Sequence, residues 1–302
     1  MTSATAAAPS KRRRLNQRTI APYLFVLPNM LIFAIFVIWP AINGFNLSFY
    51  DSSDGLTFTK VGTQNYTEIL SDSQFWDVVR NTIVYTVGFV LLSLVIGTVL
   101  ALMLNSQRKG RGGISAAYFL PVLISPVVVG LVWRSALDPK TGLVNLVLGK
   151  VGLPQPQWLV EPAPSLLAIV LVGTWIHLGF YAMILLSGLQ SIDGNLFEAA
   201  KIDGASSWQQ TRRITLPLLQ PSLMVVVILA TIAGFQSFDF IYTLTGGGPV
   251  GATTLMVQYI YDKGFSYPIQ YGLASAAAVI LFVAVFIVTF TNYLLGRRNE
   301  AI

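Results

Sequence analysis

Long apolar runs separated by shorter polar segments dominate the amino-acid sequence. A helix that crosses the roughly 30 Å hydrocarbon core of a bilayer needs about 20 mostly apolar residues. The runs are continuously apolar and lack the alternating pattern of membrane barrel strands, so we expect helices. The pattern therefore predicts an all-α membrane protein with six transmembrane helices, at approximately 20–40, 82–104, 115–134, 165–187, 221–242 and 272–295.

The composition agrees with a membrane protein and argues against a soluble domain. Of the 302 residues, 54% are hydrophobic and only 11% are charged, whereas about a quarter of the residues in soluble domains are charged. The chain has no cysteine, which excludes disulfides, thiolate metal sites and cysteine nucleophiles. His177 is the only histidine, which argues against a histidine-based metal centre.

The basic residues indicate how the spans are oriented. Six spans divide the connections and termini into two sets, and thirteen of the 19 Lys and Arg residues fall in the set that contains both termini. These are Lys11, Arg12, Arg13, Arg14, Arg18, Arg108, Lys109, Arg111, Lys201, Arg212, Arg213, Arg297 and Arg298. The other set contains Lys60, Arg80, Arg134, Lys140, Lys150 and Lys263. Because cytoplasmic loops carry the excess of basic residues, we expect both termini in the cytoplasm and the acidic loop at 51–77 outside.

Residues 1–19 form a polar tail that contains a basic cluster, Lys11 to Arg14, shortly before the first apolar run. A cleaved signal peptide is the alternative interpretation. Its apolar region would be about 7 to 15 residues long and would end at a small-residue cleavage site, whereas this run ends in Ile38-Trp39-Pro40. We therefore expect an uncleaved first helix, with the basic cluster held at anionic lipid head groups and no nucleic-acid partner.

The segment 188–220 is a long connection on the side expected to be cytoplasmic, and it carries helix signals. Asn195 is a candidate N-cap for a first helix, and Gly204 is a natural stop for it. Ser206 or Ser207 can cap a second helix, which Pro217 is expected to end before the next span. The segment is therefore predicted to form a helix-turn-helix at the membrane surface.

The same segment contains a distinctive spacing. Glu198-Ala199-Ala200 is followed after three residues by Gly204, and after nine more by Ile214-Thr215-Leu216-Pro217. This string resembles the EAA loop of the permease subunits of bacterial ABC importers, in which the loop forms coupling helices that dock on the ATP-binding subunit. The resemblance assigns ATPase coupling to Glu198, Ala199, Ala200, Gly204, Ile214, Leu216 and Pro217. A plain amphipathic connector is the alternative, and it would explain a helix but not this particular string.

The resemblance covers residues 22–296 and is strongest to the carbohydrate-uptake branch of that family, which contains the maltose transporter's permease subunits. The passages that carry it are Trp39-Pro40, Ser48-Phe49, Asn81-Thr82, Phe238-Asp239, Leu244-Thr245-Gly246-Gly247-Gly248-Pro249 and Tyr271-Gly272-Leu273-Ala274-Ser275-Ala276. The run from Leu244 to Pro249 is similar to the maltose transporter's larger permease subunit and implies one member of a heterodimer. The chain lacks that subunit's large outer insertion, so it resembles the shorter relatives that import sugars, polyols or glycerol phosphate compounds.

The resemblance implies a type I ABC importer permease fold in the bacterial cytoplasmic (inner) membrane. The implied domains are the cytoplasmic tail 1–19, a six-helix permease domain at 20–296 and a cytoplasmic tail at 297–302. The implied partners are a second homologous permease subunit, two ATPase subunits, an extracytoplasmic solute-binding protein and membrane lipid. The chain itself is expected to be a transport subunit without a cofactor, with ATP and Mg²⁺ bound by the partner ATPase.

The glycine run from Gly246 to Thr253 also comes close to a phosphate-binding loop of the form G-x-x-x-x-G-K-[ST]. Ala252 occupies the position of the lysine that would reach the phosphates, and Pro249 interrupts the loop. The expected orientation also places the loop outside, away from cytoplasmic ATP. We therefore expect no nucleotide site here.

A path for a hydroxyl-rich solute needs hydrogen-bonding groups and aromatic faces, because the solute loses water on entry. The fourth and fifth spans offer such groups at Trp175, His177, Tyr181, Gln236, Ser237, Asp239 and Tyr242. Each has a simpler explanation: Asp239 lies near a helix end, His177 could be a packed interior residue, and Trp or Tyr at helix ends are common interfacial anchors. The path assignment is therefore a hypothesis with these alternatives open.

Two further features concern packing. Pro121 and Pro126 lie within the third span, where each removes a backbone donor and promotes a kink. Kinked helices suit a gate that alternates between two openings. They are also common in membrane proteins as features that do not move. The small residues at 274–278 permit close helix packing, within the chain or against a partner.

An ion-coupled secondary transporter, with Asp239 and His177 as the ion site, is the rival function. Such carriers usually show internal repeats, and none is evident between the two halves of this chain. A membrane scaffold would need a large soluble interaction domain, which the sequence does not contain. The resemblance favours a sugar or oligosaccharide, on the frequency of such solutes in the family alone. A phosphate-bearing solute would call for an interior Lys or Arg, and the spans carry none.

Overall fold

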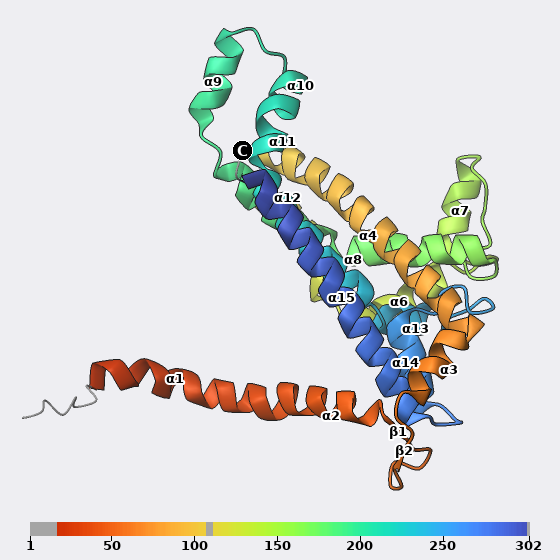
Figure 1. Ribbon diagram of the computed structural model, residues 1–302. Coiled ribbons are helices and arrows are strands. Elements are labelled where there is room, and N and C mark those ends of the chain that lie inside the picture. The colour runs from red at the N-terminus through yellow and green to blue at the C-terminus, as the bar shows by residue number, and fades with distance from the viewer. Residues whose placement is uncertain (1–16, 107–110, 301–302) are drawn as a thin grey trace, which may run out of the picture. The chain divides into compact units, whose positions relative to one another are not determined.

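The structure is a computed structural model that describes residues 17–106 and 111–300 (Figure 1). The chain divides into two compact units, residues 1–46 and residues 47–302. The fold is mostly helical, as predicted, with one short two-stranded hairpin in the second unit. The basic cluster at 11–14, together with Arg108 and Lys109, lies outside the described residues.

The first unit is one apolar helical rod. It consists of α1 (Gln17–Phe33), a π-helical turn η1 (Ala34–Ile38) and α2 (Trp39–Leu47), whose last residue belongs to the second unit. The stretch Pro22–Leu47 is long and apolar enough to cross a membrane. The predicted first span therefore extends about two turns beyond residue 40. Its described side chains are almost all exposed, as suits a span surrounded by lipid or by another subunit.

The second unit contains three uninterrupted membrane-length helices. They are α4 (Ser73–Ser106), α8 (Pro162–Gln190) and α15 (Tyr271–Glu300). Two further pairs of helices each have the length and hydropathy of a span but bend sharply at a break: α5 (Arg111–Leu123) with α6 (Pro126–Ala136), and Ser207–Leu218 with α12 (Gln220–Phe235). The described chain thus has four candidate spans, or up to six if each bent pair counts as one.

The remaining elements are short and connect these helices. They are β1 (Tyr50–Asp51), β2 (Thr59–Lys60), α3 (Gln64–Ser71), α7 (Leu143–Lys150), α9 (Gly194–Ile202), α10 (Ser207–Gln210), a π-helical turn η2 (Thr211–Thr215), α11 (Leu216–Leu218), α13 (Asp239–Leu244) and α14 (Met256–Phe265). The strands pair antiparallel, with Tyr50 opposite Lys60 and Asp51 opposite Thr59.

Proline explains both bends. Pro126 forces the preceding Ser125 out of the helical region, to φ −54° and ψ 128°, and α5 and α6 then meet at 105°. Pro121 stays inside α5, so only one of the two predicted kinks marks the break. Pro221 lacks the N–H that would bond the carbonyl of Pro217, and the chain bends by 64° between Leu218 and Gln220.

The core of the second unit lies along α4 and α8. Tyr85 and Phe89 of α4 pack with Tyr181 and Leu185 of α8, and all four side chains are at most 1% exposed. A second cluster joins α3, α4, α14 and α15, and it includes Ala276 and Ala277, both fully buried. Of the small residues at 274–278, Ala274, Ala276 and Ala277 are therefore buried within the chain, whereas Ala278 is exposed.

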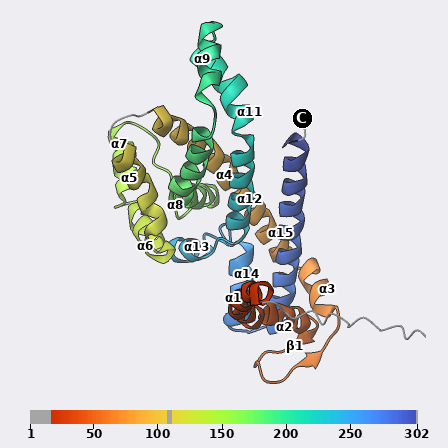
Figure 2. The same cartoon turned by 90° about the vertical axis from the view of Figure 1, so that its left-hand side faces the viewer.

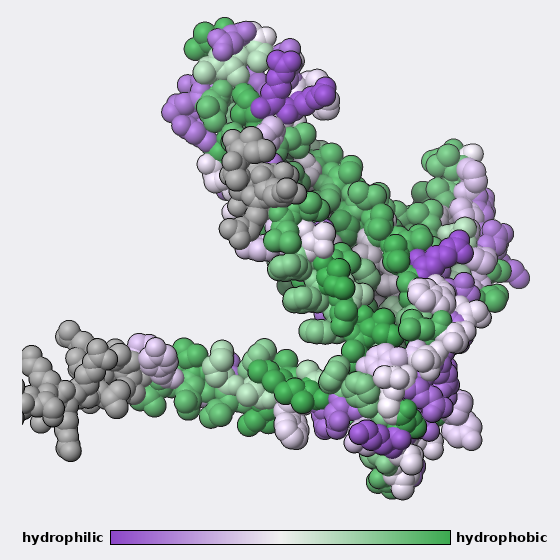
Figure 3. Space-filling model, in the orientation of Figure 1, coloured by the Kyte–Doolittle hydropathy of each residue, from purple (hydrophilic) through white to green (hydrophobic). Residues whose placement is uncertain are grey.

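Several connections of the second unit lie at opposite ends of the helical body, whereas the segment with α7 projects from its side (Figures 1 and 2). One end carries α9 to α11 together with the C-terminal end of α15. The other end carries the strands, α3 and α14. Figure 3 shows apolar residues along the helical body and polar residues gathered over α9 and α10.

Two exposed aspartates organise loops in the second unit. Asp54 accepts hydrogen bonds from the hydroxyl of Thr57 and from the backbone N–H groups of Thr57 and Leu56, which lowers the pKa of its carboxyl below the usual range. Asp138 accepts hydrogen bonds from the N–H and hydroxyl of Thr141, and its pKa is lowered for the same reason. Both carboxylates replace backbone partners that these tight turns lack.

The glycine run is a self-contained turn rather than a phosphate cradle. The hydroxyl of Thr253 lies 2.7 Å from that of Thr245 and donates to the carbonyl of Gly248, also at 2.7 Å. Asn81 of α4 donates to the carbonyl of Gly251 at 3.0 Å and fixes the loop to the helical body. The loop thus has the role of a structural connection between α13 and α14.

Close packing of α8 against α5 depends on a glycine and gives a testable prediction. A side chain at Gly179 would overlap the backbone of Tyr118, which cannot move aside as a flexible side chain could. Gly179→Ala should therefore lower the free energy of unfolding of the purified protein by about 1–3 kcal/mol. Its apparent unfolding temperature should fall accordingly.

Gly113→Ala is the matched control, because no atom lies within 4 Å of the position that its new methyl group would occupy. The two variants are compared by thermal unfolding in one detergent. Equal unfolding temperatures for Gly179→Ala and the parent chain would contradict the packing described for α5 and α8.

Candidate functional site

The segment 191–219 forms a helical hairpin at one end of the second unit (Figure 1). Asp193 caps α9, because its Oδ1 accepts a hydrogen bond from the backbone N–H of Asn195 at 3.0 Å. The cap predicted at Asn195 is therefore wrong by two residues. The error has a simple cause: Asp and Asn are both good caps, and the sequence offers them two positions apart.

Gly204 reverses the chain between the two helices, as predicted. Its φ is +78°, a left-handed conformation that residues with a Cβ rarely adopt. The N–H of Ala205 donates to the carbonyl of Ala200 at 2.8 Å, and the N–H of Gly204 donates to that of Lys201 at 3.1 Å. This pair of bonds is the Schellman motif, which satisfies carbonyls at the end of α9.

The second helix of the hairpin begins as predicted but ends later. Ser206 caps α10 through a capping box: its Oγ accepts from the N–H of Gln209, whose Oε1 accepts from the N–H of Ser206. The helix continues through η2 and α11, past Pro217, to Leu218. The prediction that Pro217 ends the helix is therefore wrong; the break falls just before Pro221, as described above.

The hairpin leaves apolar side chains uncovered. Within α9 no residue is buried, and Ile202 is 87% exposed. Glu198 and Ala199 are exposed as well, whereas Ala200, Ile214 and Leu216 are half-buried. The residues Ala200, Asp203, Gly204, Ala205, Gln209, Gln210, Arg213 and Ile214 line a hollow of about 360 Å³ between the two helices. A nine-residue helix without a buried face needs a partner to hold it, since short helices are marginal alone.

The three candidate path residues of α8 occupy different environments. Trp175 is 38% exposed and meets Trp133 of α6 edge to face, with ring centroids 5.6 Å apart. His177 is half-buried, and its Nδ1 lies 3.0 Å from the carbonyl of Gly173. Tyr181 is 1% exposed and lies in the core, so its ring is not accessible to a solute in this conformation.

The candidates at the end of the fifth span lie around a helix break. Helix α12 ends at Phe235, and a separate short helix α13 begins at Asp239. The predicted span 221–242 is therefore too long, and Asp239 starts α13 instead of lying near the end of a span. Gln236, Asp239 and Tyr242 are all exposed, spaced three residues apart on this corner.

Tyr85 of α4 connects the two groups of candidates. Its hydroxyl lies 3.0 Å from the Oγ of Ser237, which itself donates to the carbonyl of Ala233 at 2.8 Å. The ring of Tyr85 stacks on Phe89, and Phe89 meets the ring of His177 edge to face. The buried face of α4 thus fixes the corner at Ser237 relative to α8.

A row of aromatic rings next to this corner was not predicted. Phe238 and Tyr242 contact Tyr261 of α14, with ring centroids 5.2 and 5.6 Å apart, and Tyr261 stacks on Phe265. The sequence contains a signal for it, because both Phe238 with Tyr242 and Tyr261 with Phe265 are four residues apart, on one face of a helix.

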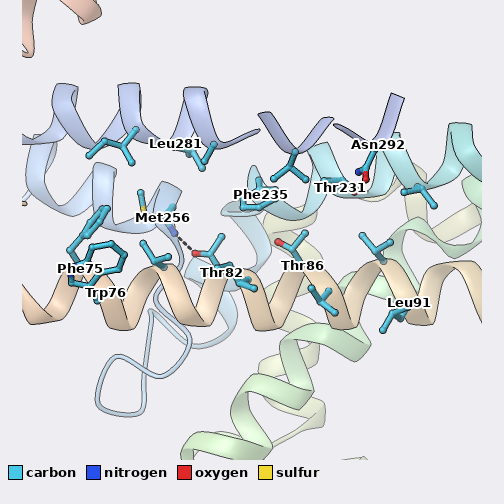
Figure 4. Close-up of a pocket in the computed structure, with 18 of the residues that line it drawn as sticks. Phe75, Trp76, Thr82, Thr86, Leu91, Thr231, Phe235, Met256, Leu281 and Asn292 are labelled. Carbon is cyan, nitrogen blue, oxygen red and sulfur yellow. Dashed lines mark hydrogen bonds between the residues drawn. The ribbon is translucent and has the colours of Figure 1, made fainter. Parts of the chain in front are cut away.

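One further hollow of the second unit is not a path for a polar solute. It is an apolar groove of about 580 Å³ between α4, α12, α14 and α15 (Figure 4). Thr82, one of the few polar residues of its wall, already accepts a hydrogen bond from the N–H of Met256 at 3.0 Å and donates to the carbonyl of Val78. The lining suits hydrocarbon or another helix rather than hydroxyl groups.

Comparison with known proteins agrees with this arrangement. Residues 93–300 match the protein family described as "Binding-protein-dependent transport system inner membrane component". The chain is 36% identical to the trehalose/maltose transport system permease protein MalF of Thermococcus litoralis, over 91% of this chain and 93% of that protein. It is 32% identical to the arabinooligosaccharides transport system permease protein AraP of Bacillus subtilis, over 89% and 86% of the two chains.

A solved structure shares the fold. The chain superimposes with a TM-score of 0.80 and 27% identity on a chain of a bacterial alginate ABC transporter in complex with an alginate pentasaccharide-bound periplasmic protein. The match covers 93% of this chain and 96% of that one. The family match and these relatives show that this chain is a multi-pass inner-membrane protein and belongs to the binding-protein-dependent transport system inner membrane components, as a permease of the carbohydrate-uptake type.

Proposed function

We propose that this chain is one of two permease subunits of an ATP-driven importer and that its hairpin 191–219 receives the ATPase. The observation that carries the proposal is the exposed face of α9, where Glu198, Ala199 and Ile202 have no cover within the described chain. Small side chains allow close approach of a partner surface, and an exposed carboxylate can pair with a partner arginine. ATP and Mg²⁺ would be bound by that partner.

The orientation with both termini in the cytoplasm is part of the proposal. The hairpin and the C-terminal end of α15 lie at the same end of the second unit (Figures 1 and 2). This end bears Lys201, Arg212 and Arg213, which belong to the basic set. An ATPase that uses cytoplasmic ATP can reach the hairpin only in this orientation.

The hairpin can transmit movement because of how it is connected. It joins the end of α8 to α12, and Leu219, which is fully buried, fixes its base. Closure of two ATPase subunits on nucleotide would displace α9 and carry α8 and α12 with it. Rigid movement of those helices relative to a second permease subunit would switch access between the two sides of the membrane.

The solute is proposed to be a sugar or a related compound such as an oligosaccharide, polyol or glycerol phosphate compound. Two similar permeases bear names that refer to trehalose, maltose and arabinooligosaccharides. An extracytoplasmic solute-binding protein would deliver the solute to the corner at 236–242. There the exposed Gln236, Asp239 and Tyr242 offer an amide, a carboxylate and an aromatic face, which are the groups that recognise hydroxyl-rich rings.

The candidates on α8 contribute differently to this path. Trp175 is accessible, whereas His177 is half-buried, so only the exposed part of its side chain can contact a solute. Tyr181 is enclosed, so its part in the proposed path is to pack against His177, with ring centroids 5.9 Å apart. The proposal therefore assigns direct contact first to the corner at 236–242.

Gly204→Ala tests the coupling role of the hairpin. Alanine at φ +78° costs about 1–2 kcal/mol in the native turn, although the methyl group meets no neighbour. We expect solute-stimulated ATP hydrolysis by the reconstituted transporter to fall by about fivefold to thirtyfold. Gly194→Ala is the matched control, since it lies in the same hairpin with open space around it and a helical backbone.

Glu198→Gln tests the exposed carboxylate without changing its size. We expect weaker retention of the ATPase during purification, with the unfolding temperature unchanged because Glu198 has no partner among the described residues. Glu161→Gln, an exposed carboxylate before α8, is the control. Normal ATPase retention and normal ATP hydrolysis in both the Glu198 and Gly204 variants would refute the docking assignment.

The energy source separates this proposal from an ion-coupled carrier. Uptake into vesicles should require ATP and an ATPase subunit and should persist when a protonophore removes the ion gradient. Asp239→Asn should alter solute affinity but not the dependence on a gradient. Uptake that needs the gradient and not ATP would favour the ion-coupled mechanism.

Tyr85→Phe tests how the corner at 236–242 is positioned. The change removes the hydrogen bond to Ser237, which is worth about 1 kcal/mol, so the half-saturating solute concentration for uptake should rise about fivefold. Thr174→Val is the control, because the Thr174 hydroxyl is also buried but bonds only the carbonyl of Val170 in its own helix. The same half-saturating concentration for Tyr85→Phe and the parent would show that the corner does not bind the solute.

A further inference from the structure

The second arm of the hairpin, Ser207–Leu218, exposes a different set of groups from α9. Trp208 is 69% exposed and Leu218 is 48% exposed, and Arg212 and Arg213 are exposed between them. Within the described chain neither arginine forms a hydrogen bond or an ion pair. An exposed indole beside two uncompensated guanidinium groups is a combination that proteins place at the membrane–water interface.

The bend at Leu219 sets the depth of these groups. At a rise of about 1.5 Å per residue, Arg212 lies about 10 Å and Trp208 about 16 Å along the arm from Leu219. The arm is bent 64° from α12, so these lengths correspond to only about 5 and 7 Å along the α12 axis. With α12 along the membrane normal and Leu219 at the edge of the hydrocarbon core, both residues would fall within the polar layer of the bilayer, which is about 5–8 Å thick on each side.

The same residues line a hollow. Trp208, Gln209, Arg212 and Arg213 enclose a space of about 290 Å³ on the surface of the arm. The capping box holds Gln209 in place through its Oε1. The guanidinium groups present planar forks of donors that match phosphate oxygens, and the indole adds an amphipathic ring at the same level.

We propose that Trp208, Arg212 and Arg213 bind the phosphate group of an anionic phospholipid in the adjacent leaflet. The hairpin then has two contacts: the exposed α9 meets the ATPase, and Trp208, Arg212 and Arg213 of the second arm meet the membrane surface. Such a contact anchors the end of α12 that moves during transport. It makes the activity of the transporter depend on anionic lipid, because each arginine near a charged surface contributes to the attraction.

The test uses the assembled transporter, reconstituted in nanodiscs that contain equal amounts of phosphatidylglycerol and phosphatidylcholine. The chain contains no cysteine, so Thr211→Cys, on the same arm, gives the chain a single site for a fluorophore, which is attached before assembly with the partner subunits. The fluorescence of this label is then measured with a spin label, which acts as quencher, on the head group of one of the two lipids. Spin-labelled phosphatidylglycerol should quench the fluorescence more than spin-labelled phosphatidylcholine. Arg212→Gln and Arg213→Gln should each reduce this preference about fivefold, and the double variant more strongly.

Lys201→Gln is the control, because Lys201 is an exposed cation on α9, outside the lining of the hollow. Retention of the ATPase in a neutral detergent, without anionic lipid, is measured for the same variants. Normal retention with a lost lipid preference supports the proposal. An unchanged preference for phosphatidylglycerol in the double variant overturns it. Loss of the ATPase in neutral detergent would also overturn it, because the arginines would then bind an acidic surface of that partner.

Discussion

Backbone N–H and C=O groups inside a bilayer have no water to bind, so a spanning chain must satisfy them within helices. This constraint explains why the second unit is built on uninterrupted helices such as α4 and α8, whose facing side chains form the core. The positions where the helices end are therefore of particular interest. The chain changes direction at the breaks at 124–125, 219 and 236–238, and the candidate residues Gln236, Asp239 and Tyr242 lie at or next to the last of these.

The apolar pattern was sufficient to predict a mostly helical membrane protein, because hydrophobic length is the dominant signal for a span, but it did not show that two of the predicted spans are bent pairs of helices. The turn at Gly204 and the cap at Ser206 were also predictable, since a left-handed residue and a capping side chain have strong sequence preferences. The bends were not, because a proline permits several outcomes: Pro121 stays inside a helix, whereas Pro126 begins a new one. Which outcome occurs depends on packing that a single sequence does not encode locally.

The candidate path illustrates the same limit. Sequence reasoning placed Asp239 near the end of a span, because the mostly apolar stretch 221–242 has the length of one span. The structure instead turns the chain at Gln236, where the hydroxyl of Tyr85 lies against Ser237. That contact joins residues 152 positions apart, and only the folded structure brings them together. Tyr181, by contrast, is a polar aromatic residue that the core encloses, so residue type alone does not identify a solute contact.

The central claim is that α9 is a docking surface for an ATPase subunit, and a labelling experiment tests it directly. Ile202→Cys places the single thiol of the chain at a residue that is 87% exposed, and Leu56→Cys provides a control at a residue that is 86% exposed in the segment after β1. The rate of maleimide labelling is measured for each variant with and without bound ATPase. We predict that the ATPase protects Ile202→Cys and leaves Leu56→Cys reactive. Equal labelling of Ile202→Cys in the presence and absence of the ATPase would contradict the account.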